Sequence, residues 1–135
     1  MNSSNSGNPF DDAPVVFRYT REQALADGVL VDLTPWARET GFALPVACTA
    51  AVWNQYIVPP EGTHELGQSE RGRAHDVLSM LYLTIKTTPG SSDRLLYKVI
   101  FLQAPGKQVT VQLRAICGPG DDGAPVLTIL RPDED

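Results

Sequence analysis

The chain has 135 residues, 42% of them hydrophobic, which suits one domain with a single packed core. Its eleven prolines and eleven glycines exclude a bundle of long helices and predict short elements separated by turns. The formal net charge of −5 lies in residues 1–67, where three arginines face eight acidic residues, and it disfavours a nucleic-acid partner because phosphate binding rests on Lys and Arg.

The chain begins with a polar segment. Residues 1–13 are small, polar and turn-forming, a composition that predicts a disordered lead. We expect a single domain over residues 14–131, starting with a short strand at residues 15–17, and an acidic tail over residues 132–135. Thr20 and Gln23 have the spacing of a capping box, so a first helix should cover residues 20–27 and stop at Gly28.

The next segments predict two further helical stretches. Residues 29–33 are either a buried strand or an apolar linker. Thr34 before Pro35 predicts the start of a second short helix, which Gly41 should end. Residues 45–57 are ambiguous, since Val and Cys favour a strand while Thr49 can cap a helix. We favour the helix there, followed by an exposed acidic loop at residues 59–68.

The longest helix begins after Ser69, with an apolar stripe at Ala74, Val77, Leu78, Leu81 and Ile85. The pattern then changes to strands at residues 95–103, 108–117 and 125–131, joined by turns of hairpin length. The middle strand alternates apolar and polar residues, so one face should be buried and the other wet. We therefore predict an α+β fold, with short N-terminal helices and one longer helix packed on a C-terminal antiparallel β-meander of three or four strands.

The expected cellular compartment follows from the absence of membrane-spanning and signal-peptide patterns in the sequence. No apolar run approaches the ~18 residues that span a bilayer, and the first residues have no signal-peptide pattern, so we expect no membrane partner. Cys48 and Cys117 have no neighbouring cysteine, which predicts two buried free thiols rather than a disulfide. A cytoplasmic protein is the expectation.

No catalytic motif stands out in the sequence. Asp32 directly follows an apolar run, where a ligand can reach a carboxylate, although Asp in this position commonly bonds the turn that follows it. Cys48 and His75 are the most plausible nucleophile and base, but a cysteine among apolar residues usually only fills the core. A pocket that gathers Asp32, Cys48 and His75 between the N-terminal helices and the sheet is the alternative hypothesis.

Other polar residues suggest binding. The histidines and nearby glutamates match no metal-ligand spacing, and we expect no metal and no cofactor. Acidic residues of the first half offer a contact patch for a basic protein surface: Asp27, Asp32, Glu39, Glu61 and Glu65. Arg114 lies on the wet strand face, with Lys98 and Arg131 nearby, but this platform lacks the aromatic residues on which nucleic-acid bases stack.

Two segments carry a family resemblance: YTREQALADGVLVDLTPWARETGF, residues 19–42, and PVACTAAVW, residues 45–53. They resemble a family of small uncharacterised bacterial proteins associated with plasmids and integrated mobile elements. The likeness continues through GRAHDVLSMLYLTI and LLYKVIFLQ and covers about residues 15–130. The resemblance implies no catalytic residue. It implies an accessory role in a mobile element, for which interference with host defence deserves consideration.

We therefore expect a small cytoplasmic accessory protein of a mobile element that acts by binding a protein, with inhibition of host defence as the role to test. We do not expect an enzyme. Two alternatives stay open. One is a small enzyme or ligand-binding protein with the pocket described above, and the other is a nucleic-acid-binding protein that uses Lys98, Arg114 and Arg131.

Overall fold

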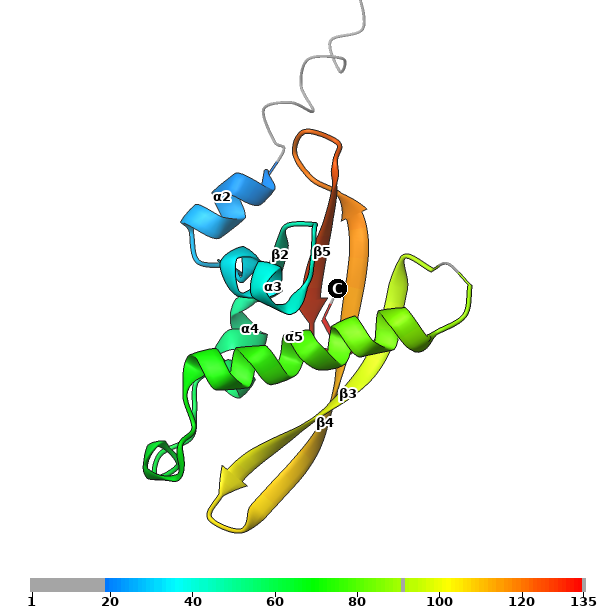
Figure 1. Cartoon of the computed structure of the whole chain (residues 1–135). Coiled ribbons are helices and arrows are strands. Elements are labelled where there is room, and N and C mark those ends of the chain that lie inside the picture. Colours follow the sequence, from blue (N-terminus) through cyan, green and yellow to red (C-terminus); the bar gives the residue numbers. More distant parts are fainter. Residues whose placement is uncertain (1–18, 91, 135) are drawn as a thin grey trace, which may run out of the picture.

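A computed structural model describes residues 19–90 and 92–134, which form a five-stranded sheet with helices packed on it (Figure 1). The strand order is β1-β2-β5-β4-β3, with β2 and β5 parallel and the other neighbours antiparallel. The strands are β1 (Leu30–Asp32), β2 (Val46–Thr49), β3 (Arg94–Ala104), β4 (Lys107–Pro119) and β5 (Pro125–Leu130). The lead predicted for residues 1–13 and the strand predicted for residues 15–17 lie outside the described residues.

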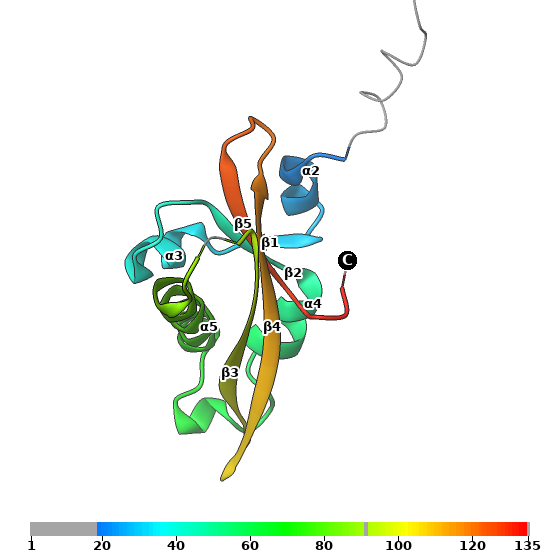
Figure 2. The ribbon, with the colours of Figure 1, turned by 90° about the vertical axis from the view of Figure 1, so that its right-hand side faces the viewer.

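Helical elements lie on both sides of the sheet. They are α2 (Arg21–Ala26), α3 (Thr34–Thr40), α4 (Ala50–Val52) with a π-helical continuation (Trp53–Ile57), a 3-10 turn (His64–Leu66) and α5 (Glu70–Thr87). Seen along the sheet, α3 and α5 lie on one side, and α2 lies on the other (Figure 2). The predicted α+β class and the antiparallel meander of β3, β4 and β5 are confirmed. None of the helices described here is long and apolar enough to cross a membrane.

The main core forms between α5 and the sheet. Four residues of the predicted α5 stripe are completely buried: Ala74, Val77, Leu78 and Leu81. Alternate residues of β3 and β4 complete this core: Tyr97, Val99, Phe101, Leu113 and Ala115. Each fully buried Leu, Val or Phe side chain stabilises the fold by about 1.5–3 kcal/mol. Ile85, the last residue of the stripe, is 38% exposed and borders a pocket.

A buried arginine joins α5 to its neighbours. Arg73 is 2% exposed and lies over the Phe101 ring, 4.5 Å from the ring centre. Its guanidinium donates to the backbone carbonyls of Tyr56 (2.6 Å) and Leu102 (2.9 Å) and to the side-chain oxygen of Gln68 (3.2 Å). Burial lowers the pKa of Arg73. Neutral acceptors from the π-helix, the following connection and β3 therefore hold this charge.

The first helix, α2, is fixed both locally and by a distant turn. The predicted capping box is present, with Gln23 N–H donating to Thr20 Oγ1 (3.0 Å) and Thr20 N–H donating to the Gln23 side chain (2.8 Å). Asp121, in the β4–β5 turn, accepts from the N–H of Arg21 at 2.8 Å. The Arg21 guanidinium donates to the Thr128 hydroxyl on β5 at 2.7 Å. These contacts hold α2 against the second face of the sheet.

The helix that we favoured for residues 45–57 is wrong in its first part. Residues 46–49 form β2, and the helix begins only after Thr49, whose hydroxyl accepts from the Val52 N–H at 3.2 Å. Because β2 lies between β1 and β5, its first three residues are buried, an environment in which Val and Cys favour a strand. Residues 29–33 likewise contain a strand, β1, rather than a linker.

The second helix starts one residue differently from the prediction. Leu33, not Thr34, is the N-cap residue of α3. The Thr34 hydroxyl instead accepts from the Val46 N–H at 3.1 Å, and so ties the start of α3 to β2. Gly41 ends α3 as predicted.

Candidate functional site

The structure does not bring Asp32, Cys48 and His75 together. Asp32 ends β1, and its Oδ1 accepts from the N–H and the hydroxyl of Thr34 at 3.0 and 2.5 Å. This is the turn-forming role that competes with a functional one. The β1–β2 register places Asp32 opposite Ala47, the neighbour of Cys48. Since successive strand residues point to opposite faces, the side chains of Asp32 and Cys48 point away from each other.

The other two members of this set have different environments. Cys48 is completely buried, and burial raises the pKa of its thiol to about 12, so it stays protonated at neutral pH. His75 is exposed on α5, with its Nε2 3.3 Å from the Ser79 hydroxyl. Within residues 19–90 and 92–134, no group of three or more His, Cys, Asp and Glu side chains is arranged to hold a metal ion.

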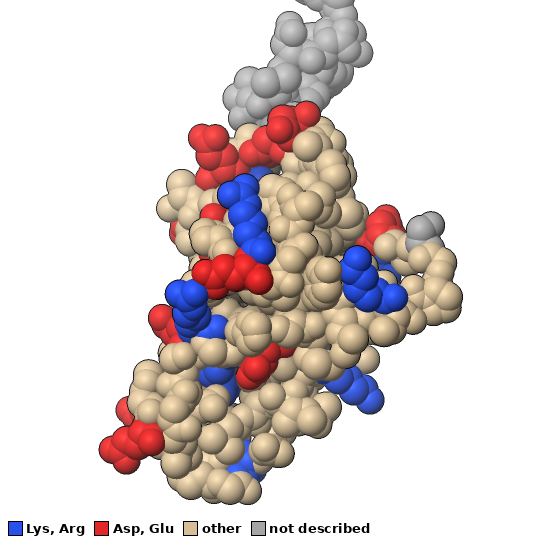
Figure 3. Space-filling model, in the orientation of Figure 1, with Lys and Arg blue, Asp and Glu red and all other residues tan. Residues whose placement is uncertain are grey.

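The acidic contact residues come from separate elements. Glu39, on α3, forms an ion pair with Arg71 at 2.7 Å, with both side chains more than half exposed. Glu61 and Glu65 lie exposed in the connection before α5, and no hydrogen bond or ion pair among the described residues engages them. Acidic and basic side chains are interspersed on the face shown in Figure 3. A long carboxylate row does not form on this face.

Arg114, on the wet face of β4, is held by C-terminal residues. Its guanidinium donates to the Glu134 carbonyl. The Glu134 side chain accepts from the Arg131 N–H at 2.8 Å, and the Arg131 guanidinium donates to the Gln55 side chain at 2.9 Å. Two of the three cations in the platform of Lys98, Arg114 and Arg131 are therefore engaged within the protein.

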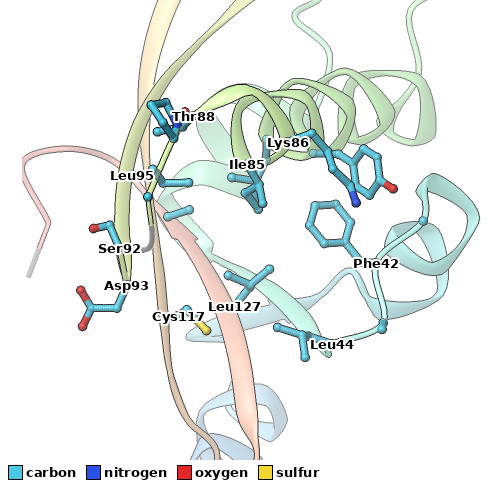
Figure 4. A pocket seen from close by; sticks show the side chains of 17 residues that line it. Phe42, Leu44, Ile85, Lys86, Thr88, Ser92, Asp93, Leu95, Cys117 and Leu127 are labelled. Atoms are coloured by element: carbon cyan, nitrogen blue, oxygen red, sulfur yellow. The ribbon is translucent and has the colours of Figure 1, made fainter.

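An apolar pocket of about 450 Å³ lies between α5, the connection from α3 to β2, and the sheet (Figure 4). Its lining includes Phe42, Leu44, Leu81, Ile85, Leu95 and Leu127. Polar residues also line it, among them Lys86, Ser92 and Asp93. The volume and the mostly apolar wall fit a small-molecule site. No single motif marks this pocket in the sequence, because its lining comes from segments far apart in the chain.

One wall of the pocket depends on Gly41. This residue has a φ of 124°, and a Cβ added to it would lie 3.1 Å from the Tyr82 ring on α5. Both the backbone angle and the close approach therefore favour glycine. Phe42, the next residue, meets the Tyr82 ring edge to face, with 5.4 Å between the ring centres. These contacts hold the chain against the C-terminal half of α5.

Cys117 belongs to the same pocket. The expectation that both thiols are buried is correct for Cys48 and wrong for Cys117, which is only partly buried. Cys117 is near the end of β4, where that strand extends beyond α5 and borders the pocket. It therefore contributes the accessible one of the two thiols.

The second candidate site is the outer edge of β3, the last strand of the sheet. In an antiparallel pair, residues that exchange backbone hydrogen bonds with the partner alternate with residues whose N–H and C=O point away from it. The Cys117 N–H donates to the Asp93 carbonyl at 2.7 Å, which makes this pair a hydrogen-bonded one. Continuing the register, the backbone groups that point away from β4 are those of Arg94, Leu96, Lys98, Ile100 and Leu102.

Side chains occupy both ends of this edge, in agreement with the alternation. The Ser92 hydroxyl accepts from the Arg94 N–H (3.2 Å) and donates to the Arg94 carbonyl (2.9 Å). At the other end, Arg73 donates to the Leu102 carbonyl. Between these ends, none of the described hydrogen bonds uses the outward backbone groups of Leu96, Lys98 and Ile100. We call residues 96–100 the open segment of β3.

The open segment also exposes apolar side chains. Leu96 and Ile100 are 56% and 59% exposed, and Lys98 between them is exposed too. Strand alternation puts all three on the face opposite to that of the buried residues Tyr97 and Val99. In the sequence, this strand is apolar on both faces, as in a strand covered on both sides. Lys98 is the signal that one face is open.

These features define a small α+β protein with an apolar pocket and an open sheet edge. The chain belongs to a family of unknown function, DUF6573, whose model matches residues 6–135. The chain matches none of the curated proteins and none of the solved structures with which it was compared. Membership confirms the resemblance to a family without an established function, whereas the association with mobile elements stays a prediction.

Proposed function

We propose that this protein is a binding protein rather than an enzyme, and that an extended segment of a partner protein pairs with the open segment of β3. One observation carries the proposal: Leu96, Lys98 and Ile100 direct unused backbone N–H and C=O groups outward, between two ends that side chains occupy. Strand addition to an exposed sheet edge is a recurrent mode of peptide recognition, in which these backbone groups supply the affinity.

The shape of the hairpin supports this proposal. β3 and β4 contain 11 and 13 residues, whereas β5 contains 6, so the far half of the hairpin extends beyond the rest of the sheet (Figure 1). The helix α5 packs on one face of β3 and leaves the other face accessible. A partner strand would therefore meet little steric obstruction along β3.

We further propose that this binding takes place in the cytoplasm, as an accessory function of a mobile element that inhibits a host defence protein. The likeness of residues 19–42 and 45–53 to proteins of plasmids and integrated elements supports this context. The two free cysteines fit a reducing compartment. Glu61 and Glu65 provide a second contact for a basic area of the same partner.

Replacing Lys98 by proline tests the binding mode. Proline removes the outward N–H of this residue, and it is tolerated at an edge where that N–H faces solvent. Lys98→Arg is the matched control, because it keeps both the N–H and the charge. In pull-downs from the native host, mass spectrometry should find a partner that the wild type and Lys98→Arg retain and Lys98→Pro loses.

The variants must first show similar thermal unfolding, so that the comparison concerns binding alone. A partner that remains equally bound to folded Lys98→Pro would show that it contacts another surface. Strand addition at the open segment would then be abandoned.

The apolar pocket supports a second candidate function, the binding of a small apolar ligand. Its volume of about 450 Å³ and its leucine-rich lining are the observations in favour. This version of a ligand-binding protein differs from the one based on Asp32, Cys48 and His75, since none of these three residues lines the pocket.

Cys117 reports directly on occupation of this pocket. A bound ligand should slow the labelling of Cys117 by a maleimide several-fold, while the buried Cys48 stays unlabelled in the folded protein. The measurement compares labelling rates with and without an organic extract of host cells. An unchanged rate would count against a natural ligand in this pocket.

A further inference from the structure

We infer that the partner strand is acidic, with Asp or Glu opposite Lys98 and apolar residues opposite Leu96 and Ile100. The inference rests on the proposed function and gives the partner segment a sequence pattern. That pattern is one carboxylate with an apolar residue two positions away on each side, because alternate residues of an added strand share a face.

The pattern follows from the exposed side chains of the open segment. Leu96 and Ile100 stand on either side of Lys98 on one strand face, and both are more than half exposed. Residues directly opposite each other on neighbouring strands have their Cβ atoms about 5 Å apart, close enough for apolar contact and for charge pairing. An apolar–acidic–apolar strand would cover Leu96 and Ile100 and neutralise Lys98.

The charge of the whole hairpin favours the same partner. Residues 94–119 contain four of the eleven basic residues of the chain and none of its sixteen acidic residues. The basic residues are Arg94, Lys98, Lys107 and Arg114. The hairpin is thus a basic segment of a protein whose net charge is −5, and it attracts an anionic segment while the remainder of the protein repels it. This charge distribution directs an acidic strand to the hairpin.

A second copy of this chain is a poorer occupant of the edge. Pairing through β3 in both copies would bring two hairpins side by side, each with basic and no acidic side chains. The two-fold arrangement centred on Lys98 would also place the two Lys98 side chains directly opposite each other, and like charges in such positions are destabilising. A lysine in an exposed edge strand commonly prevents this kind of self-association.

Nucleic acid is also a poorer occupant. Arg114 and Arg131 are engaged by Glu134 and Gln55, which leaves Lys98 as the accessible cation of that platform. The exposed neighbours of Lys98 are aliphatic, and they offer no aromatic ring for base stacking. Apolar contact and backbone pairing suit a peptide strand better than a phosphate backbone.

The test is an NMR titration of the full chain, labelled with ¹⁵N, with capped heptapeptides. The probe peptide has glutamate at its centre, valine two positions to either side, and threonine elsewhere. Its symmetry allows the same contacts in parallel and antiparallel pairing. The comparison peptide has lysine at the centre, and a single-stranded oligonucleotide is a third probe. The same titrations are repeated on Lys98→Glu, a change at an exposed side chain.

We expect the glutamate peptide to shift the amide signals of Leu96, Lys98 and Ile100. It should also bind about fivefold more tightly than the lysine peptide, because an opposite-charge pair with Lys98 replaces a like-charge pair. Lys98→Glu should reverse this preference. Equal binding of both peptides at the open segment would contradict the acidic preference and leave the proposed binding mode intact. Failure of both peptides to bind there, or tighter binding of the oligonucleotide, would contradict the binding mode as well.

Discussion

Cys48 and Tyr97 are buried ionisable residues whose environment favours the neutral form. Burial raises the pKa of the Cys48 thiol from 9.0 to about 12. Burial also raises the pKa of the Tyr97 hydroxyl above its ordinary value of 10.0, and nearby Cys48 adds to that shift. The Tyr97 hydroxyl finds no hydrogen-bond partner among the residues described. Ionisation of either group therefore favours the unfolded chain.

This environment predicts an alkaline loss of stability. Well below pH 9.0 the Cys48 thiol is protonated in both states, so it adds no pH dependence to the free energy of unfolding. Between pH 9.0 and about 12 it ionises only in the unfolded chain, so the free energy of unfolding falls by about 1.4 kcal/mol per pH unit. Urea denaturation from pH 8 to pH 11 should show a shallower decline for Cys48→Ala than for the wild type.

Cys117→Ala is the matched control for this measurement, because Cys117 is only partly buried. It should keep the slope of the wild type. If Cys48→Ala also keeps that slope, the thiol of Cys48 is not held in its neutral form by burial.

Residues that act on their near neighbours could be predicted from the sequence. Thr20 and Gln23 form the expected capping box, because both partners lie within one helical turn. Arg73 could not be predicted, since its role depends on the carbonyls of Tyr56 and Leu102, which only the fold brings to it. The same holds for the candidate sites. The sequence identifies Lys98 as a cation, but only the strand order and register show that its backbone N–H is unused.

At the scale of elements, periodicity predicted the structure wherever one face of an element is buried. The stripe of α5 and the alternation of β4 each identified the buried face correctly. The prediction failed at residues 46–49, because the first three residues of β2 are all buried and show no alternation of apolar and polar positions. A short apolar run of this kind is compatible with a strand or a helix until its neighbours are known.

The element on which the proposed function rests, β3, shows the opposite difficulty. Its sequence is apolar at positions that face the core and at positions that face solvent, so the pattern alone suggests a strand covered on both faces. The structure makes β3 an edge strand with one face open. Leu96 and Ile100 are therefore candidate contact residues, because exposed apolar side chains that lie together often mark an interaction site.

At the scale of the whole molecule, the basic hairpin that carries the open segment is distinct from the acidic remainder of the chain. Four basic residues lie in the β3–β4 hairpin, which carries the open segment, and all the acidic residues lie elsewhere in the chain. The apolar pocket lies on the side of the sheet covered by α5, near the start of β3. The open sheet edge and the pocket are therefore separate, and the two proposed functions can be tested independently.

The central claim is that the edge of β3 is unpaired over residues 96–100 in the free protein. Residue-resolved amide hydrogen exchange of the monomer measures this directly. We expect the amides of Leu96, Lys98 and Ile100 to exchange at least about tenfold faster than those of Tyr97 and Val99, which donate to β4. In β4, which has strands on both sides there, Ala115 and Ile116 should both exchange slowly. Uniformly slow exchange from Leu96 to Ile100 would show that the edge is already covered, and would contradict the account.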